Sequence, residues 1–178
     1  VGSAGRPSRL TSDPAEDLNP VWSPDARQIA LARRSGKRAG LYLISSLGGS
    51  ERKLADFQHA TLPNLAWAPN GKVLAVAEVD PEGNKGIFAR DIEKGERWRL
   101  TSNPDFEDQS PAFSPDGRFL AYASFHGLHS GDIFVQPLWP DFRPQGQPRR
   151  LTHQGFFNRG ITWAADGRSL IYSASRQA

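Results

Sequence analysis

The 178-residue sequence contains no cysteine and no methionine. Without cysteine there is neither a disulfide nor a thiolate-bound metal, so disulfide-stapled folds and zinc-ribbon sites are excluded. No run of about 18 apolar residues occurs, so we expect no membrane insertion. Because the chain begins with Val1 and lacks methionine throughout, we expect it to be an excised or processed piece of a longer protein.

Familiar catalytic motifs are absent as well. The sequence has no G-x-S-x-G, H-E-x-x-H, G-x-x-x-x-G-K or G-x-G-x-x-G pattern. These are common signatures of serine hydrolases, zinc peptidases and nucleotide-binding enzymes. We therefore expect no enzyme activity, no catalytic residue and no cofactor in this chain.

Neither charge predominates, because 22 Lys and Arg residues oppose 19 Asp and Glu residues, for a formal net charge of +3. The densest basic run, RRSGKR at residues 33–38, has no aromatic residue interleaved for stacking on bases. We expect this run to be a solvated loop, and we expect no nucleic-acid partner.

The sequence contains four copies of one motif. An aromatic residue heads each copy, with spacings of 45, 46 and 50: Trp22, Trp67, Phe113 and Trp163. A second marker, a basic residue followed by Leu, has spacings of 44, 46 and 51 and falls at residues 9–10, 53–54, 99–100 and 150–151. Two independent markers in one register indicate a repeat architecture.

Each repeat is interpreted as four short antiparallel strands. The first ends at the aromatic and enters a Ser-Pro-Asp-Gly type of turn, in which Pro presets φ and Gly adopts a positive φ. The second is apolar at consecutive positions, which indicates burial on both faces. The fourth carries the basic-Leu marker and suits an outer edge. This pattern predicts an all-β fold, a β-propeller of about four blades.

The repeats predict one propeller domain over residues 1–178 that forms a partial or half ring. The expected blades are 19–55, 64–101, 110–152 and an incomplete 160–176, with 6–11 as an outer closing strand. Blades 1 and 4 should each expose a broad apolar face. Either two copies join head to tail to give about eight blades, or a longer parent supplies the rest.

The copies WSPD (22–25), WAPN (67–70), FSPDG (113–117) and WAADG (163–167), with Arg-Leu-Thr between them, resemble the WD-like propeller repeat of TolB. Similar repeats occur in tricorn-type and prolyl-oligopeptidase-type proteins and in sensory regions of bacterial regulators. The resemblance covers residues from about 6 to 176. It implies a non-catalytic scaffold that binds a protein or peptide, and it favours the periplasm, with the cytoplasm left open. The alternatives are the substrate-gating propeller of a serine peptidase whose catalytic domain is absent and a ligand-sensing region.

Polar residues lie just ahead of each aromatic, where the loops between blades should reach the mouth of the central channel. They are candidate residues for binding a protein or peptide partner: Asp17, Asn19, Asn64, Asp108, Gln109, Asn158 and Arg159. The alternative is that they satisfy backbone groups in turns. Phe156 and Phe157 add an apolar contact or pack the loop. If the candidates form an exposed rim, reversing the charge of Asp17 and Asp108 should leave stability nearly intact.

One further cluster carries potential metal ligands: His126, His129 and Asp132 fall within seven residues. These residue types bind zinc and similar ions. Their surroundings read as a Gly-rich loop between the second and third strands, which is not preorganised. We interpret them as ordinary loop residues and expect no metal site.

Overall fold

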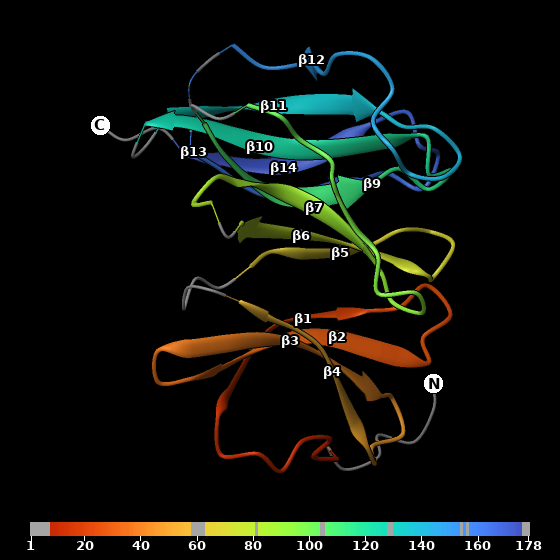
Figure 1. Ribbon diagram of the computed structural model, residues 1–178. Coiled ribbons are helices and arrows are strands. Elements are labelled where there is room, and N and C mark those ends of the chain that lie inside the picture. Colours follow the sequence, from red (N-terminus) through yellow and green to blue (C-terminus); the bar gives the residue numbers. More distant parts are fainter. Residues whose placement is uncertain are drawn as a thin grey trace.

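The computed structural model describes residues 8–57, 63–80, 82–103, 106–127, 130–153, 155 and 157–175, without the side chains of 157–159. All of its regular elements are strands, which form three four-stranded sheets and one two-stranded sheet, all antiparallel. The sheets stack face to face as blades (Figure 1). The all-β propeller predicted from the sequence is therefore confirmed, and the described sheets do not close a ring.

Within each blade the strands pair in chain order, from the innermost to the outermost. Blade 1 comprises β1 (Glu16–Trp22), β2 (Gln28–Ser35), β3 (Arg38–Ser45) and β4 (Glu51–Phe57). Blade 2 comprises β5 (Leu65–Trp67), β6 (Val73–Val79), β7 (Lys85–Asp91) and β8 (Arg97–Arg99). Blade 3 comprises β9 (Glu107–Phe113), β10 (Phe119–Gly127), β11 (Ser130–Pro137) and β12 (Arg149–Arg150). Blade 4 comprises β13 (Phe157–Trp163) and β14 (Leu170–Ser175).

The core consists of the interfaces between blades, and in blades 1, 2 and 3 the second strand supplies residues to both sides. On β6, Leu74 and Val76 pack toward blade 1, whereas Val73 and Ala75 pack toward blade 3. This alternation follows from the period of two along a strand. It explains why the second strands are apolar at consecutive positions.

A tryptophan at the end of the first strand bonds two blades together. The Trp67 indole Nε1 donates to the Val21 carbonyl oxygen at 3.1 Å. Trp163 Nε1 makes the same bond to the Ala112 oxygen at 3.0 Å. In each case the acceptor lies one residue before the aromatic of the preceding blade. Trp22 heads blade 1 and is 57% exposed, and its indole has no acceptor within the described part of the chain.

The two ends of the stack differ. On blade 4, Ile171 is 61% exposed, as expected for an open face. On blade 1, however, Leu10 packs on a buried cluster of Ile29, Leu31 and Ile44. The expectation of a broad apolar face on blade 1 is therefore wrong, because Leu10 covers this cluster. Residues 8–11, the described part of the expected closing strand, form no strand in the single chain.

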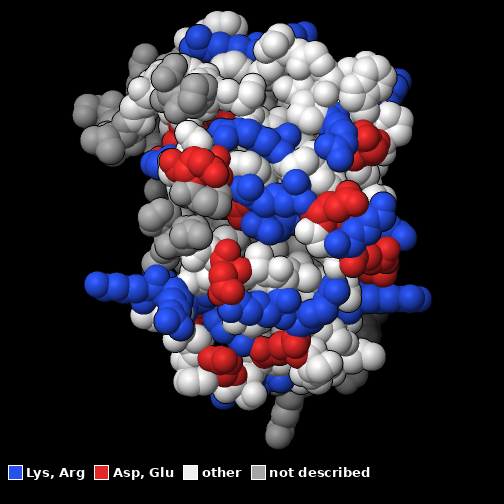
Figure 2. Space-filling model, viewed as in Figure 1, with Lys and Arg blue, Asp and Glu red and all other residues white. Residues whose placement is uncertain are grey.

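Outside the core, basic residues mark the outer strands β4, β8 and β12. Figure 2, drawn in the same view as Figure 1, shows bands of Lys and Arg across the molecule, with Asp and Glu beside them. Arg97 of β8, for example, pairs with Glu78 at 2.7 Å. Charged side chains at a sheet edge oppose pairing with foreign strands. The run at 33–38 is a β2–β3 hairpin in which Arg33 is buried, so it is only partly the solvated loop expected. No helix within the described ranges is long and apolar enough to cross a membrane.

The turn after each first strand has the conformation predicted from Ser-Pro-Asp-Gly. In blade 3, the Ser114 hydroxyl donates to Asp116 Oδ1 at 2.7 Å and accepts the Phe119 N–H at 3.0 Å. The bond from the Ser114 hydroxyl, followed by those from the Arg118 N–H and guanidinium, lowers the pKa of Asp116 to about 2. Ala26, which replaces the usual glycine in blade 1, has φ 57°, and Gly71 at the same position of blade 2 has φ 67°.

Because a Cβ is strained at positive φ, Ala26→Gly is expected to raise the free energy of unfolding by about 1 kcal/mol. The reverse change at the matched position, Gly71→Ala, should lower it by about the same amount, since the added Cβ meets only Pro24 Cδ at 3.9 Å. Urea unfolding of both variants measures the two shifts. Shifts of the same sign would show that backbone strain is not the cause.

Candidate functional site

The first strands of all four blades line one groove, the described part of the central channel. It has a volume of about 220 Å³, and each blade contributes the residue three positions before its aromatic: Asn19, Asn64, Ser110 and Gly160. Three of these residues have a positive φ, namely Asn19 (50°), Ser110 (53°) and Gly160 (63°). They coincide with β-bulges in β1, β9 and β13. A bulge bends the strand and changes where its side chains point, here at the channel wall.

Asn19 and Asn64 also join neighbouring blades. Asn19 Nδ2 donates to the Pro63 oxygen at 3.0 Å, and Asn64 Oδ1 accepts the Ser110 N–H at 3.2 Å. Both side chains therefore satisfy backbone groups, which is the alternative interpretation of these residues. They line the groove at the same time.

A second pocket, which we call the mouth pocket, adjoins the groove through Asn64. It has a volume of about 200 Å³, and three candidate residues, Asn64, Asp108 and Gln109, line it. Its walls also include Glu78, Lys85 and Glu107. The structure thus brings residues from blades 2 and 3 together around one cavity.

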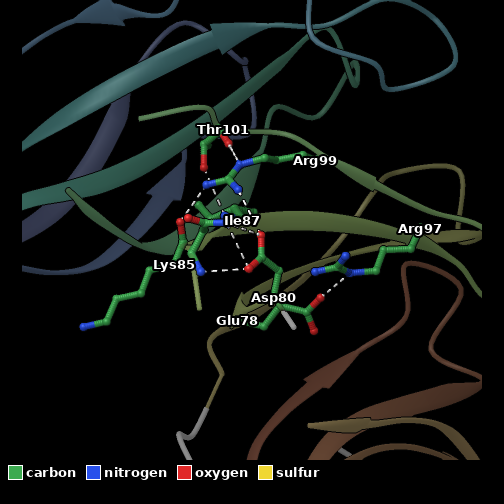
Figure 3. Close-up of polar contacts among 8 residues, drawn as sticks. Glu78, Asp80, Lys85, Ile87, Arg97, Arg99 and Thr101 are labelled. Atoms are coloured by element: carbon green, nitrogen blue, oxygen red, sulfur yellow. Dashed lines mark hydrogen bonds and ion pairs between the residues drawn. The ribbon is translucent and has the colours of Figure 1, made fainter. Parts of the chain in front are cut away.

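Most charges in the walls of the mouth pocket are paired. Lys85 Nζ contacts Glu107 Oε2 at 2.5 Å, and Gln109 Nε2 donates to Glu107 Oε1 at 2.6 Å. Burial raises the pKa of Glu107, but these two bonds outweigh it, so the pKa is lowered. Glu78 is held by Arg97 (Figure 3) and by Arg90 at 2.9 Å.

Figure 3 also shows the network that fixes the wall on β7. The Ile87 N–H donates to Thr101 Oγ1 at 3.0 Å. Arg99 donates to the Thr101 oxygen at 2.5 Å and to the Lys85 oxygen at 2.8 Å, and it lies 3.4 Å from Asp80. These bonds tie the Arg-Leu-Thr marker of blade 2 to β7, so the marker has a structural role.

Asp108 differs from the other carboxylates of the mouth pocket. It is 2% exposed, and Ser124 Oγ donates to its Oδ1 at 2.6 Å. Its Oδ2 is buried and has no hydrogen-bond partner among the described residues. Burial raises the pKa of Asp108, against the hydroxyls of Ser124 and Thr101, which lower it.

Asp17 occupies the same position in blade 1 but is fully paired. Arg33, which is buried, donates to its two oxygens at 2.6 and 3.0 Å and also pairs with Glu51. Burial raises the pKa of Asp17, and the Arg33 bonds more than offset it, so the pKa is lowered. Asp17 and Asp108 are thus not part of an exposed rim, and charge reversal at either residue is now expected to cost stability. Lysine would break a buried ion pair at the first and be buried at the second.

Asn158 and Arg159 lie on β13, but their side chains are outside the described ones, as is that of Phe157. Phe156 and His129 fall outside the described residues altogether.

His126 and Asp132 lie on β10 and β11 and not in a loop, which corrects the expectation. Asp132 is fully buried and is used inside the blade. Thr152 Oγ1 donates to its Oδ1 at 2.9 Å, Arg150 pairs with its Oδ2, and His126 Nε2 lies 3.4 Å away. Within the described ranges, no three His, Cys, Asp or Glu residues form a group that could hold a metal.

Four residues around the mouth pocket were not singled out from the sequence: Glu78, Lys85, Glu107 and Ser124. The sequence nevertheless contains a pattern that points to two of them, Glu78 and Ser124. When the second strands are aligned on their apolar columns, Arg33, Glu78 and Ser124 fall at one position. An arginine, a glutamate and a serine at one repeat position indicate a place where the blades differ in charge.

Comparisons with known proteins agree with this architecture. The family model described as the TolB beta propeller domain matches residues 3–178. An uncharacterized peptidase, YuxL of Bacillus subtilis, is 28% identical over 158 residues, which cover 88% of this chain and 22% of that protein. The Tol-Pal system protein TolB of Desulfotalea psychrophila is 40% identical over 92 residues, which cover 52% of this chain and 20% of that protein.

Among solved structures, TolB from Acinetobacter baumannii superposes with a TM-score of 0.73 and 27% identity, over 92% of this chain and 39% of that one. The chain thus spans between a fifth and a quarter of the length of the curated relatives it matches. Since the family model covers nearly the whole sequence, the chain belongs to the TolB β-propeller domain family.

Proposed function

We propose that the chain is a non-catalytic propeller module that binds a protein or peptide at its channel-mouth face. One observation carries the proposal: the groove and the mouth pocket adjoin through Asn64 and together draw residues from all four blades. A linear or looped segment can occupy both cavities at once.

The proposal is tested at Gln109, a half-buried residue of the mouth pocket. A photo-crosslinking amino acid at position 109 should capture a specific partner, which is then purified. Gln109→Lys should weaken that partner by about tenfold with an unchanged melting temperature.

The matched control is Glu93→Lys in the β7–β8 turn, which lies on the opposite face by topology. It should leave the affinity unchanged. Equal weakening by both variants, or capture from position 93 alone, would contradict binding at the mouth.

A second candidate is favoured by the similarity to YuxL, whose name describes it as a peptidase. In that case the same face would admit peptides to a catalytic domain elsewhere in the protein. The gene sequence on both sides of this segment decides between the two: an in-frame domain with G-x-S-x-G would favour gating over partner binding.

For localisation, we extend the TolB resemblance to propose the periplasm. Fractionation of the source cells with an antibody against the chain tests this proposal, and recovery in the cytosolic fraction would contradict it.

A further inference from the structure

We infer that the mouth pocket binds a side-chain cation, the ammonium of a lysine or the guanidinium of an arginine, with Asp108 as its counter-ion. This inference rests on the proposed function, because it identifies the group through which a protein or peptide partner is recognised. It follows from a difference between blades, from the burial of Asp108 and from the composition of the pocket.

The difference between blades lies at one repeat position. In the register of blade 1, Asp17 faces Arg33, and the two form an ion pair with two hydrogen bonds. In the equivalent register of blade 3, Asp108 faces Ser124, which supplies one neutral hydroxyl donor. The fold therefore accommodates a carboxylate with an arginine beside it, and blade 3 keeps the carboxylate without the cation.

Because Asp108 is buried, the absence of a cation beside it lowers the stability of the folded state. A buried carboxylate oxygen without a hydrogen bond destabilises the folded state. Asp108 Oδ2 is such an atom among the described residues: the Thr101 hydroxyl lowers the pKa of the carboxyl group but makes no hydrogen bond to Oδ2. The charge of Arg99 acts on Asp108 and lowers its pKa, but the N–H groups of Arg99 are used by Thr101, Lys85 and Asp80. A group that costs stability and lies in a cavity is expected where binding compensates for it.

The composition of the pocket favours a cation. Three carboxylates line it, of which Glu107 is paired with Lys85 and Glu78 with Arg90 and Arg97. Asp108 is the carboxylate that has no ion-pair partner among the described residues, and the amides of Asn64 and Gln109 lie beside it in the wall. The volume of about 200 Å³ suits a single side chain. An incoming ammonium or guanidinium would supply the missing donor to Oδ2 and form a buried, charge-assisted hydrogen bond.

The test uses small probes, so it needs no identified partner. Nα-acetyl-lysine methylamide and Nα-acetyl-arginine methylamide are titrated at millimolar concentrations, with the uncharged Nα-acetyl-norleucine methylamide as control. The cationic probes should shift the NMR signals of Asn64, Asp108 and Gln109, and the norleucine probe should not. Equal shifts from all three probes, or none from any of them, would overturn the inference.

Two variants make the result specific. Asp108→Asn keeps the oxygen that accepts from Ser124 and removes the charge, so it should weaken the cationic probes by at least about tenfold. Glu93→Gln, in an exposed turn that pairs with Lys72, should leave their affinity unchanged. Undiminished binding by Asp108→Asn would show that this carboxylate is not the counter-ion.

The wild-type chain provides a readout that needs no variant. Because the pKa of Asp108 is raised in the folded state, its ionisation removes stability as pH rises from the unfolded value of about 3.9 through the folded one. A bound cation favours the ionised form, so the cationic probes should lower the titration midpoint of the Asp108 carboxyl carbon. An unchanged midpoint under saturating probe would contradict the inference.

The outcomes also separate the inference from the proposed function. If the probes bind but crosslinking at position 109 captures no partner, the cation site stands and protein binding at this face does not. If a partner binds at the mouth but neither cationic probe does, protein binding stands and the role of Asp108 is refuted.

Discussion

Replacing Trp67 by alanine is expected to lower the free energy of unfolding by about 4 kcal/mol. The indole is buried between blades 1 and 2, where it packs with Leu41, Leu74 and Val76. It also donates the hydrogen bond to the Val21 oxygen. Truncation leaves a cavity and an unpaired carbonyl at the same interface, and the two costs add. Urea unfolding measures the loss, and hydrogen exchange should show blade 1 exchanging first.

Trp22→Ala is the matched control, because Trp22 has the same repeat position but is largely exposed. Because the Trp22 side chain faces solvent in the single chain, this change should cost less than about 1 kcal/mol. A cost equal to that of Trp67→Ala would show that Trp22 is covered in solution. A second copy joined head to tail would cover it in that way, and the cost would then depend on protein concentration.

Asp132→Ala is expected to lower the free energy of unfolding by about 3 kcal/mol. Asp132 is fully buried, and its two oxygens hold the outer strand through Thr152 and Arg150. Removing the carboxylate leaves the Arg150 guanidinium and the Thr152 hydroxyl without their acceptor. Fluorescence-detected urea unfolding at neutral pH gives the size of the effect.

The same residue predicts a pH dependence. Burial raises the pKa of Asp132, but the bonds from Thr152, Arg150 and the Gly155 N–H outweigh it, so the pKa is lowered. The ionised form thus stabilises the fold above the unfolded pKa of about 3.9, and that stabilisation is lost as pH falls through the folded value.

The difference between wild type and Asp132→Ala should therefore shrink below about pH 4. The control is Asp56→Ala, which removes a largely exposed carboxylate paired with Lys53 and should cost less than about 1 kcal/mol. A pH-independent difference at Asp132 would mean that packing, and not the charge, accounts for the loss.

The repeat made much of the fold predictable. Turn residues such as Ser114 and Asp116 act within five positions of themselves, so their bonds are local and recur in each copy. The positive φ of Ala26 was predictable for the same reason, since its counterparts in the other repeats are glycines. Burial of β2, β6 and β10 on both faces also followed, because apolar residues at consecutive positions leave no solvated side. In β14 the same pattern leaves Ile171 exposed, because no further blade packs on it in the single chain.

The candidate site was predictable in outline only. Its place near the channel mouth follows from topology, and the structure brings Asn64, Asp108 and Gln109 around one pocket. The sequence did not predict which of these residues are buried. Asp17 and Asp108 look alike in the sequence, yet their environments depend on Arg33 and Ser124, which lie 16 residues away on a paired strand.

The amino-acid sequence by itself determined the β-propeller, the strand order within each blade and the turn conformations. These features depend on short-range patterns that recur in every copy of the repeat. Only the tertiary structure decided that Leu10 folds back over blade 1, that His126 and Asp132 lie on paired strands, and that Asp108 is buried without a cation. Burial and charge pairing depend on neighbours brought together by strand register and blade stacking. A repeat pattern predicts those contacts only where the copies are identical, and the functional differences lie where they are not.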